Sequence, residues 1–202
     1  MGQKCRLHFE LAIEISAPSR ETFFRNWQIM NFGESLTRIT VWLALMLYVA
    51  SETLRVLRRD RFEISWRLNA AGCMCFLGHV ATAFYYFYNW SHADAYADTA
   101  RQSKALTGWD SGDGLYFNYL FALVWLSEVI WARISPRSYS ARAAFWGWTV
   151  RTFFFFMIFN GAFVFARSHM RWFGLVLCLV LVGSWWIQIK RSIDWRPSQK
   201  SS

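Results

Sequence analysis

Five long apolar segments, separated by short arginine-rich links, constrain this chain more than any other feature. The segments lie at about residues 36–57, 67–89, 115–132, 143–166 and 172–189. Each is close to the ~20 residues that an α-helix needs to cross ~30 Å of hydrocarbon. With 55% hydrophobic and 20% aromatic residues, the chain has more apolar side chains than a soluble domain of this length normally buries. The sequence therefore predicts an all-α, polytopic membrane protein, a bundle of five transmembrane helices.

The lysines and arginines are distributed unevenly between the links. The first link, the third link and the C-terminal segment hold most of them, whereas the second and fourth links hold two each. Because cytoplasmic links are enriched in Lys and Arg, this pattern predicts that the N-terminus is outside and the C-terminus is cytoplasmic, in a bacterial plasma (inner) membrane. A net charge of +9 would also suit nucleic-acid binding. The arginines, however, flank apolar segments and form no basic stripe, so we expect no nucleic-acid partner.

The N-terminal region differs from the rest of the chain. Residues 1–29 contain no apolar run long enough for the core of a signal peptide. Met30 begins a short polar stretch that leads directly into the first apolar segment. We therefore interpret 1–29 as a doubtful leader upstream of a true start at Met30. Residues 30–189 then form the transmembrane domain, and 190–202 form a basic cytoplasmic tail.

The longest polar insert follows the second apolar segment. Residues 92–104 suit a short helix on the outer membrane surface, because Ser91 can cap its N-terminus and acidic side chains occur early in it. The stretch GWDSGDG comes next and has two aspartates among its glycines, but it lacks the ligand spacing of an EF-hand. We interpret this stretch as a turn.

Three ionisable residues lie inside the apolar segments: Glu52, Glu128 and Arg151. Charged groups in hydrocarbon are costly, so they face the bundle interior and find partners. The rise of a helix places all three in the leaflet on the cytoplasmic side. The main interpretation is an ion-pair cluster in which both carboxylates flank Arg151 and connect three helices. Snorkelling to the interface and a proton or anion pathway are the alternatives.

His79 is the best candidate for a ligand site, on the outer half of the second segment. A neutral imidazole can bind a metal or haem iron, and haem b is the cofactor that this position suggests. Haem usually needs a second axial group, and His92 lies about 20 Å further along a continuous helix. The preferred interpretation is therefore a histidine that hydrogen-bonds to neighbouring Asn118, Asn160 or a tyrosine, with haem or a metal as the alternative. The outer-half candidates are His79, Tyr86, His92, Tyr96, Asn118 and Asn160.

No motif in the sequence indicates a reaction. The spacing of Cys73 and Cys75 is not that of a zinc or thioredoxin-like site, and three of the four cysteines lie in apolar segments, where a thiol acts as a small hydrophobe. No nucleophile elbow, HExxH motif or phosphate-binding glycine loop occurs. The prolines all lie outside the apolar segments, which favours a rigid bundle over a moving carrier.

Three functional hypotheses follow from different classes. The first is a non-catalytic subunit or assembly factor of a larger membrane complex. The second is a haem- or quinone-associated redox protein that uses His79. The third is a small oligomeric channel or transporter, with a polar path from His79, Asn118 and Asn160 to the ion-pair cluster. All three predict the lipid bilayer as a partner, together with other membrane subunits or further copies of the chain.

Overall fold

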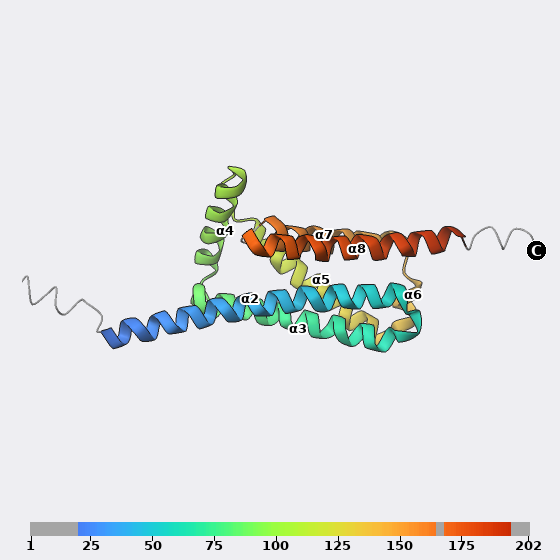
Figure 1. Cartoon of the computed structure of the whole chain (residues 1–202), viewed down its shortest axis with the longest axis horizontal. Coiled ribbons are helices and arrows are strands. Elements are labelled where there is room, and N and C mark those ends of the chain that lie inside the picture. Colours follow the sequence, from blue (N-terminus) through green and yellow to red (C-terminus); the bar gives the residue numbers. More distant parts are fainter. Residues whose placement is uncertain (1–19, 165–167, 195–202) are drawn as a thin grey trace, which may run out of the picture.

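The computed structural model describes residues 20–164 and 168–194, and within these ranges the chain is entirely helical, without strands. Its long elements are α2 (Arg20–Leu57), α3 (Phe62–Phe87), α5 (Gly114–Ile134), α7 (Ala144–Phe159) and α8 (Ser168–Asp194). They run along one axis (Figure 1), with α3 and α8 both packed against α2, and with α5 packed against α3 and α7. The short elements are η1 (Arg59–Arg61), α4 (His92–Thr107), α6 (Pro136–Ala141) and the π-helix η2 (Asn160–Val164). The predicted all-α architecture is confirmed.

Four helices are long and apolar enough to cross a membrane: Asn31–Leu57, Phe62–Phe87, Gly114–Ile134 and Met170–Arg191. They correspond to four of the five apolar segments. The remaining segment, 143–166, contains α7, whose regular α-helix ends after 16 residues, and then η2. Asn160 marks the change in helix type, and its side-chain amide donates to the carbonyl of Phe156 at 2.8 Å.

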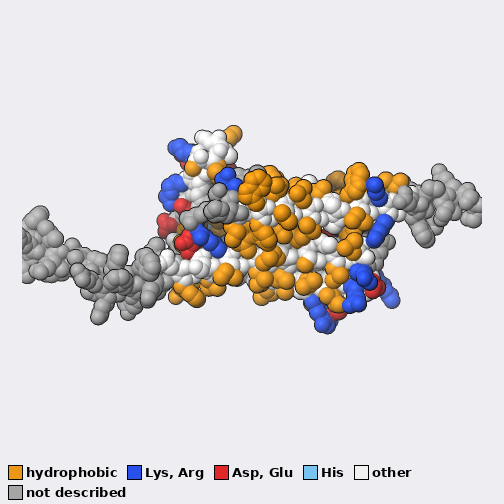
Figure 2. Space-filling model, in the orientation of Figure 1, with side chains coloured by type: hydrophobic (Ala, Val, Ile, Leu, Met, Phe, Trp, Pro, Cys, Tyr) orange, Lys and Arg blue, Asp and Glu red, His pale blue; other side chains and the backbone are white. Residues whose placement is uncertain are grey.

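Charged side chains gather at the two ends of the bundle, and apolar side chains cover the stretch between them (Figure 2). One end, which we call the basic end, holds η1 and α6; α4 lies at the opposite end and runs across the bundle axis (Figure 1). An apolar band bounded by polar ends is typical of a helical bundle that lies in a bilayer.

The helices α2 and α3 form a closely packed antiparallel pair. A Cβ atom added to Gly72 on α3 would lie 3.1 Å from the carbonyl oxygen of Ala44 on α2. Nearer the basic end, Ser51 and Ser65 are both buried and exchange hydrogen bonds: Ser51 Oγ donates to the carbonyl of Ser65 at 2.8 Å, and Ser65 Oγ donates to that of Ser51 at 3.0 Å. Small residues that bring backbones together, with hydroxyls that satisfy each other, are typical of packed membrane helices.

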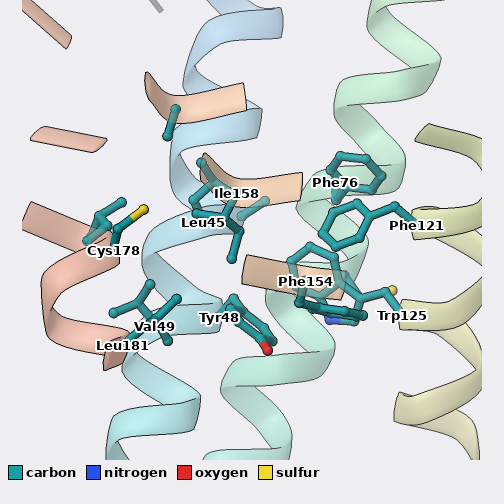
Figure 3. Close-up of a cluster of buried hydrophobic side chains, with 14 of the residues drawn as sticks. Leu45, Tyr48, Val49, Phe76, Phe121, Trp125, Phe154, Ile158, Cys178 and Leu181 are labelled. Carbon is teal, nitrogen blue, oxygen red and sulfur yellow. The ribbon is translucent and has the colours of Figure 1, made fainter. Parts of the chain in front are cut away.

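Aromatic rings form the centre of the bundle (Figure 3). Trp125 of α5 is fully buried, and its ring centroid lies 5.4 Å from that of Tyr48 on α2 and 5.6 Å from that of Phe154 on α7. Phe121 lies 4.8 Å from Phe76 of α3. The indole N–H of Trp125 donates to the buried Asn69 Oδ1 at 2.9 Å, so the polar atom of this ring is satisfied. The side chain of Trp125 therefore connects α5 to α2, α3 and α7.

The long polar insert after α3 folds as α4, at the place where the sequence predicts a short helix. Ser91 accepts a hydrogen bond from the Asp94 amide at 3.2 Å and caps the N-terminus, as its position predicts. Gly108 ends the helix with φ 79°, a conformation that favours glycine. At the chain's beginning, residues 1–19 of the predicted leader lie outside the described residues, and 20–29 form the first part of α2; 195–202 of the predicted tail also lie outside.

Candidate functional site

Glu52 is the centre of a buried charge cluster. It lies in the last part of α2 and is only 3% exposed. Its Oε1 is 3.0 Å from Nη1 of Arg55, one turn further along the same helix, and its Oε2 is 3.3 Å from Nε of Arg151 on α7. The sequence-based pairing of Glu52 with Arg151 is therefore present in the structure, and Arg55 adds a second cation.

Glu128 is where the structure differs from the predicted cluster. Its carboxylate pairs with Arg142, whose Nη1 is 2.6 Å from both oxygens, and not with Arg151. The reason is the fold of the third link, in which α6 packs against the C-terminal end of α5 and places Arg142 beside Glu128. Both side chains of this pair are nearly buried. Burial disfavours the charge of Arg142, but the hydrogen bond to Glu128 and its negative charge outweigh burial and raise the pKa of the guanidinium.

Tyr139 of α6 connects the two ion pairs. Arg55 Nη1 donates to the Tyr139 hydroxyl at 3.2 Å, and that hydroxyl donates to Glu128 Oε2 at 2.9 Å. The Arg142 guanidinium also stacks on the Tyr139 ring, 4.2 Å from its centroid. Burial and the nearby Glu128 raise the pKa of the phenol, so it stays protonated and keeps donating at neutral pH. We call the whole network the charge cluster; its members are Glu52, Arg55, Glu128, Tyr139, Arg142 and Arg151.

Three members of the charge cluster, Arg55, Tyr139 and Arg142, are absent from the sequence-based candidates. The sequence could have identified Arg55 as a partner of Glu52, because Arg55 follows Glu52 by three residues and so shares a helix face with it. Arg142 is one of several arginines in its link, and only the fold of α6 distinguishes it. The sequence gives weaker evidence for Tyr139. Pro136 marks the start of a helix, α6, so it could have predicted that Tyr139 is helical but not which residues it contacts.

His79 has a structural partner on α2. Its Nδ1 lies 2.8 Å from the backbone carbonyl of Thr37, and its ring packs 5.9 Å from that of Phe76. The expected partner was a side chain of asparagine or tyrosine, so the partner found here is a different one. Thr37 Oγ1 also donates to Thr82 Oγ1 at 3.3 Å, one turn beyond His79. These contacts hold together the halves of α2 and α3 that lie away from the basic end.

The other outer-half candidates do not gather around His79. Tyr86 lies over Gly33 of α2 and makes an edge contact with Phe32 at 6.3 Å. Asn118 is exposed on α5, and the side chain of Asn160 bonds to its own helix. The structure therefore places these residues in separate environments and not in one polar path.

His92 and Tyr96 belong to a second aromatic group, between α4 and the start of α5. His92 Nδ1 lies 3.1 Å from the hydroxyl of Tyr119, and the two rings stack at 5.8 Å. Tyr96 packs 6.0 Å from Tyr116, and its hydroxyl donates to Asp113 at 3.4 Å. These contacts hold α4 against the start of α5. His92 thus has its own partners, apart from those of His79.

A hydrogen bond between Tyr88 and Asp98 attaches α4 to the end of α3. The Tyr88 hydroxyl donates to Asp98 Oδ2 at 2.9 Å, and Arg101 and Gln102 donate to the same carboxylate. Burial and the bond to Asp98 raise the pKa of Tyr88 to about 12. Burial opposes ionisation of Asp98, but these three donors lower the pKa of its carboxyl. At neutral pH the donor is therefore protonated and the acceptor is ionised.

No group of three or more His, Cys, Asp and Glu side chains within the described residues is arranged to hold a metal ion. Cys73, Cys75 and Cys178 are free thiols. Searches against protein-family models, curated proteins and solved structures find no match to this chain. The functional argument therefore depends on the geometry of the chain itself.

Proposed function

We propose that this chain is a non-catalytic subunit or assembly factor of a larger complex in the bacterial plasma membrane, and that it binds a partner span through the outward face of α3. The polar residues of the bundle support a structural role, because they bond to one another. Trp125 donates to Asn69, Ser51 and Ser65 bond to each other, and the charge cluster connects α2, α5, α6 and α7.

The proposed topology has five crossings. Four come from the helices that are long and apolar enough, and the fifth from α7 continued by η2, which together cover residues 144–164. At about 1.5 Å per residue, such a segment is as long as the hydrocarbon core is thick. The arginine-rich links lie at the basic end, so the positive-inside rule places that end and the C-terminus in the cytoplasm, and α4 and the N-terminus outside.

The outward face of α3 is the observation that carries the proposal. Only 17% of the apolar stretch of α3 is buried within the chain, against 39% for α2, so α3 lies at the edge of the bundle. The residues opposite its buried side follow a helical spacing: Ala71, Met74, Gly78, Ala81 and Tyr85. Three of the five are Ala or Gly, and a Cβ atom added to Gly78 would meet nothing within 4 Å. Small residues at such a face allow another membrane helix to approach closely, whereas lipid contact does not require them.

Replacing Gly78 with Leu tests this proposal. Because the space beside Gly78 is open, the variant should fold like the wild type, but the leucine should block a partner helix. Native mass measurement after mild solubilisation is expected to find the wild-type chain in an assembly heavier than its own 23.8 kDa and the Gly78→Leu chain largely released from it. The mass difference identifies the partner as a second copy or another protein.

Gly183→Leu on α8 is the matched control. Gly183 also has open space around it and also lies in a candidate membrane span. The control should keep the assembly. A wild-type chain that is monomeric in the membrane extract, or an assembly lost equally in both variants, would contradict the proposal. The haem or quinone site at His79 and the oligomeric channel stay predictions from the sequence, since no contact of the described residues adds support to either.

A further inference from the structure

A cavity of about 370 Å³ lies at the basic end of the bundle, beside the charge cluster. Three arginines line it: Arg55 on α2, Arg58 directly after α2, and Arg151 on α7. Gln188 of α8 adds an uncharged polar group, and Phe62 of α3 adds an apolar side. The volume is within the range of small-ligand sites, and the arginines come from elements far apart in sequence. The bundle therefore assembles a cationic cavity.

The charge cluster beside this cavity has more cations than anions. It contains three guanidinium groups, on Arg55, Arg142 and Arg151, but only two carboxylates, on Glu52 and Glu128. Arg58 adds another positive charge at the cavity wall, and no described residue pairs with its guanidinium. A positive excess in a partly buried, low-dielectric place favours an anion from outside the chain.

Two of these arginines also have unused hydrogen-bond donors. The Nε atoms of Arg55 and Arg151 are buried and have no hydrogen-bond acceptor among the described residues. The Nε of Arg151 is near Glu52, at 3.3 Å, but not in hydrogen-bonding geometry. A buried donor without an acceptor is costly, so the acceptors of the chain do not fully satisfy these two guanidinium groups. Guanidinium groups bind phosphate oxygens in planar, paired geometry, which makes phosphate the best-suited anion.

We propose that this cavity binds a phosphate group through Arg55, Arg58 and Arg151, and that an anionic phospholipid of the adjoining leaflet supplies it. The basic end lies at the edge of the apolar band (Figure 2), where headgroups are found. Phe62 at the cavity wall offers an apolar surface to the start of an acyl chain. Basic pockets between membrane helices on the cytoplasmic side are suited to such headgroups. The inference depends on the membrane crossing proposed above, but not on the partner face of α3.

Arg58→Gln is the variant that tests the site. Arg58 is exposed and outside the ion pairs, so its replacement should leave the fold intact. The delipidated, detergent-solubilised chain is titrated with dioctanoyl phosphatidylglycerol, and the rise in thermal midpoint gives the affinity. Arg58→Gln is expected to bind about tenfold more weakly than the wild type, the effect of losing one charge-assisted hydrogen bond. Arg137→Gln, which removes an exposed charge on α6 outside the cavity, should bind like the wild type.

Two further titrations identify the source of the phosphate. Dioctanoyl phosphatidylcholine, which has no net charge, should bind much more weakly than phosphatidylglycerol. Inorganic phosphate at matched ionic strength should not displace the lipid; if it does, the phosphate site is supported but its occupant is a soluble phosphate compound. Equal binding by the wild type, Arg58→Gln and Arg137→Gln, or no binding at all, would overturn the site. Gly78→Leu should bind phosphatidylglycerol normally, so this inference and the proposed partner face can fail separately.

Discussion

Replacing Glu52 with Gln is expected to lower the free energy of unfolding by about 3–5 kcal/mol, the usual cost of removing one partner from a buried ion pair. The variant keeps the size of the side chain but leaves Arg55 and Arg151 near each other in the bundle interior without the carboxylate between them. Unfolding of the detergent-solubilised chain, followed by circular dichroism against denaturant or temperature, measures the change.

Glu63→Gln is the matched control for this prediction. Glu63 on α3 pairs with Arg67 at 3.1 Å, but both side chains are largely exposed, so its loss should change the stability by less than about 1 kcal/mol. Arg151→Leu should also destabilise the bundle, because Glu52 then loses its contact with α7. If Glu52→Gln and Glu63→Gln have the same stability, the charge cluster does not hold the helices together.

Replacing Trp125 with Ala is expected to cost about 3–5 kcal/mol of stability, because it removes a large, fully buried ring and leaves a cavity. The indole contacts rings from α2, α3 and α7, so no single helix can move to fill the space. The buried Asn69 would also lose its hydrogen-bond donor. Thermal unfolding of the purified variant measures the effect.

Trp109→Ala provides the comparison for Trp125. Trp109 is 76% exposed in the loop after α4, so its replacement should change stability by less than about 0.5 kcal/mol. Trp125→Phe keeps an aromatic ring but removes the bond to Asn69, and its stability should lie between those of the wild type and Trp125→Ala. Equal stability of Trp125→Ala and Trp109→Ala would show that the aromatic centre in Figure 3 does not determine the fold.

The sequence correctly predicts four helices that are long and apolar enough to cross a membrane, because ~20 consecutive apolar residues are a local and easily recognised pattern. It does not predict that α2 begins at Arg20 or that the regular helix α7 ends after 16 residues. It predicts the α4 cap for a local reason: Ser91 needs only a backbone amide three residues further along. The change to a π-helix at Asn160 was not foreseen, since it alters the hydrogen bonds of the helix without changing its apolar composition.

Pairings between helices were predicted less well, because they depend on how each helix is rotated and how each link folds. The position of each residue along its apolar segment predicts that Glu52, Glu128 and Arg151 lie in one leaflet. It does not predict the fold of α6, which brings Arg142 to Glu128. Likewise, the partner of His79 is the carbonyl of Thr37, a backbone group that no residue pattern marks. The sequence could therefore identify the charged residues of the cluster more easily than their contacts.

The most direct test of the central claim is cross-linking from position 78 in intact cells. A benzophenone-bearing amino acid at Gly78 or at Gly183 reacts on illumination with whatever lies against that helix, without detergent. We predict a covalent adduct with a second membrane protein chain from position 78 and none from position 183. Lipid adducts alone at position 78, or the same protein adduct from both positions, would contradict the assignment of the outward face of α3 as the partner surface.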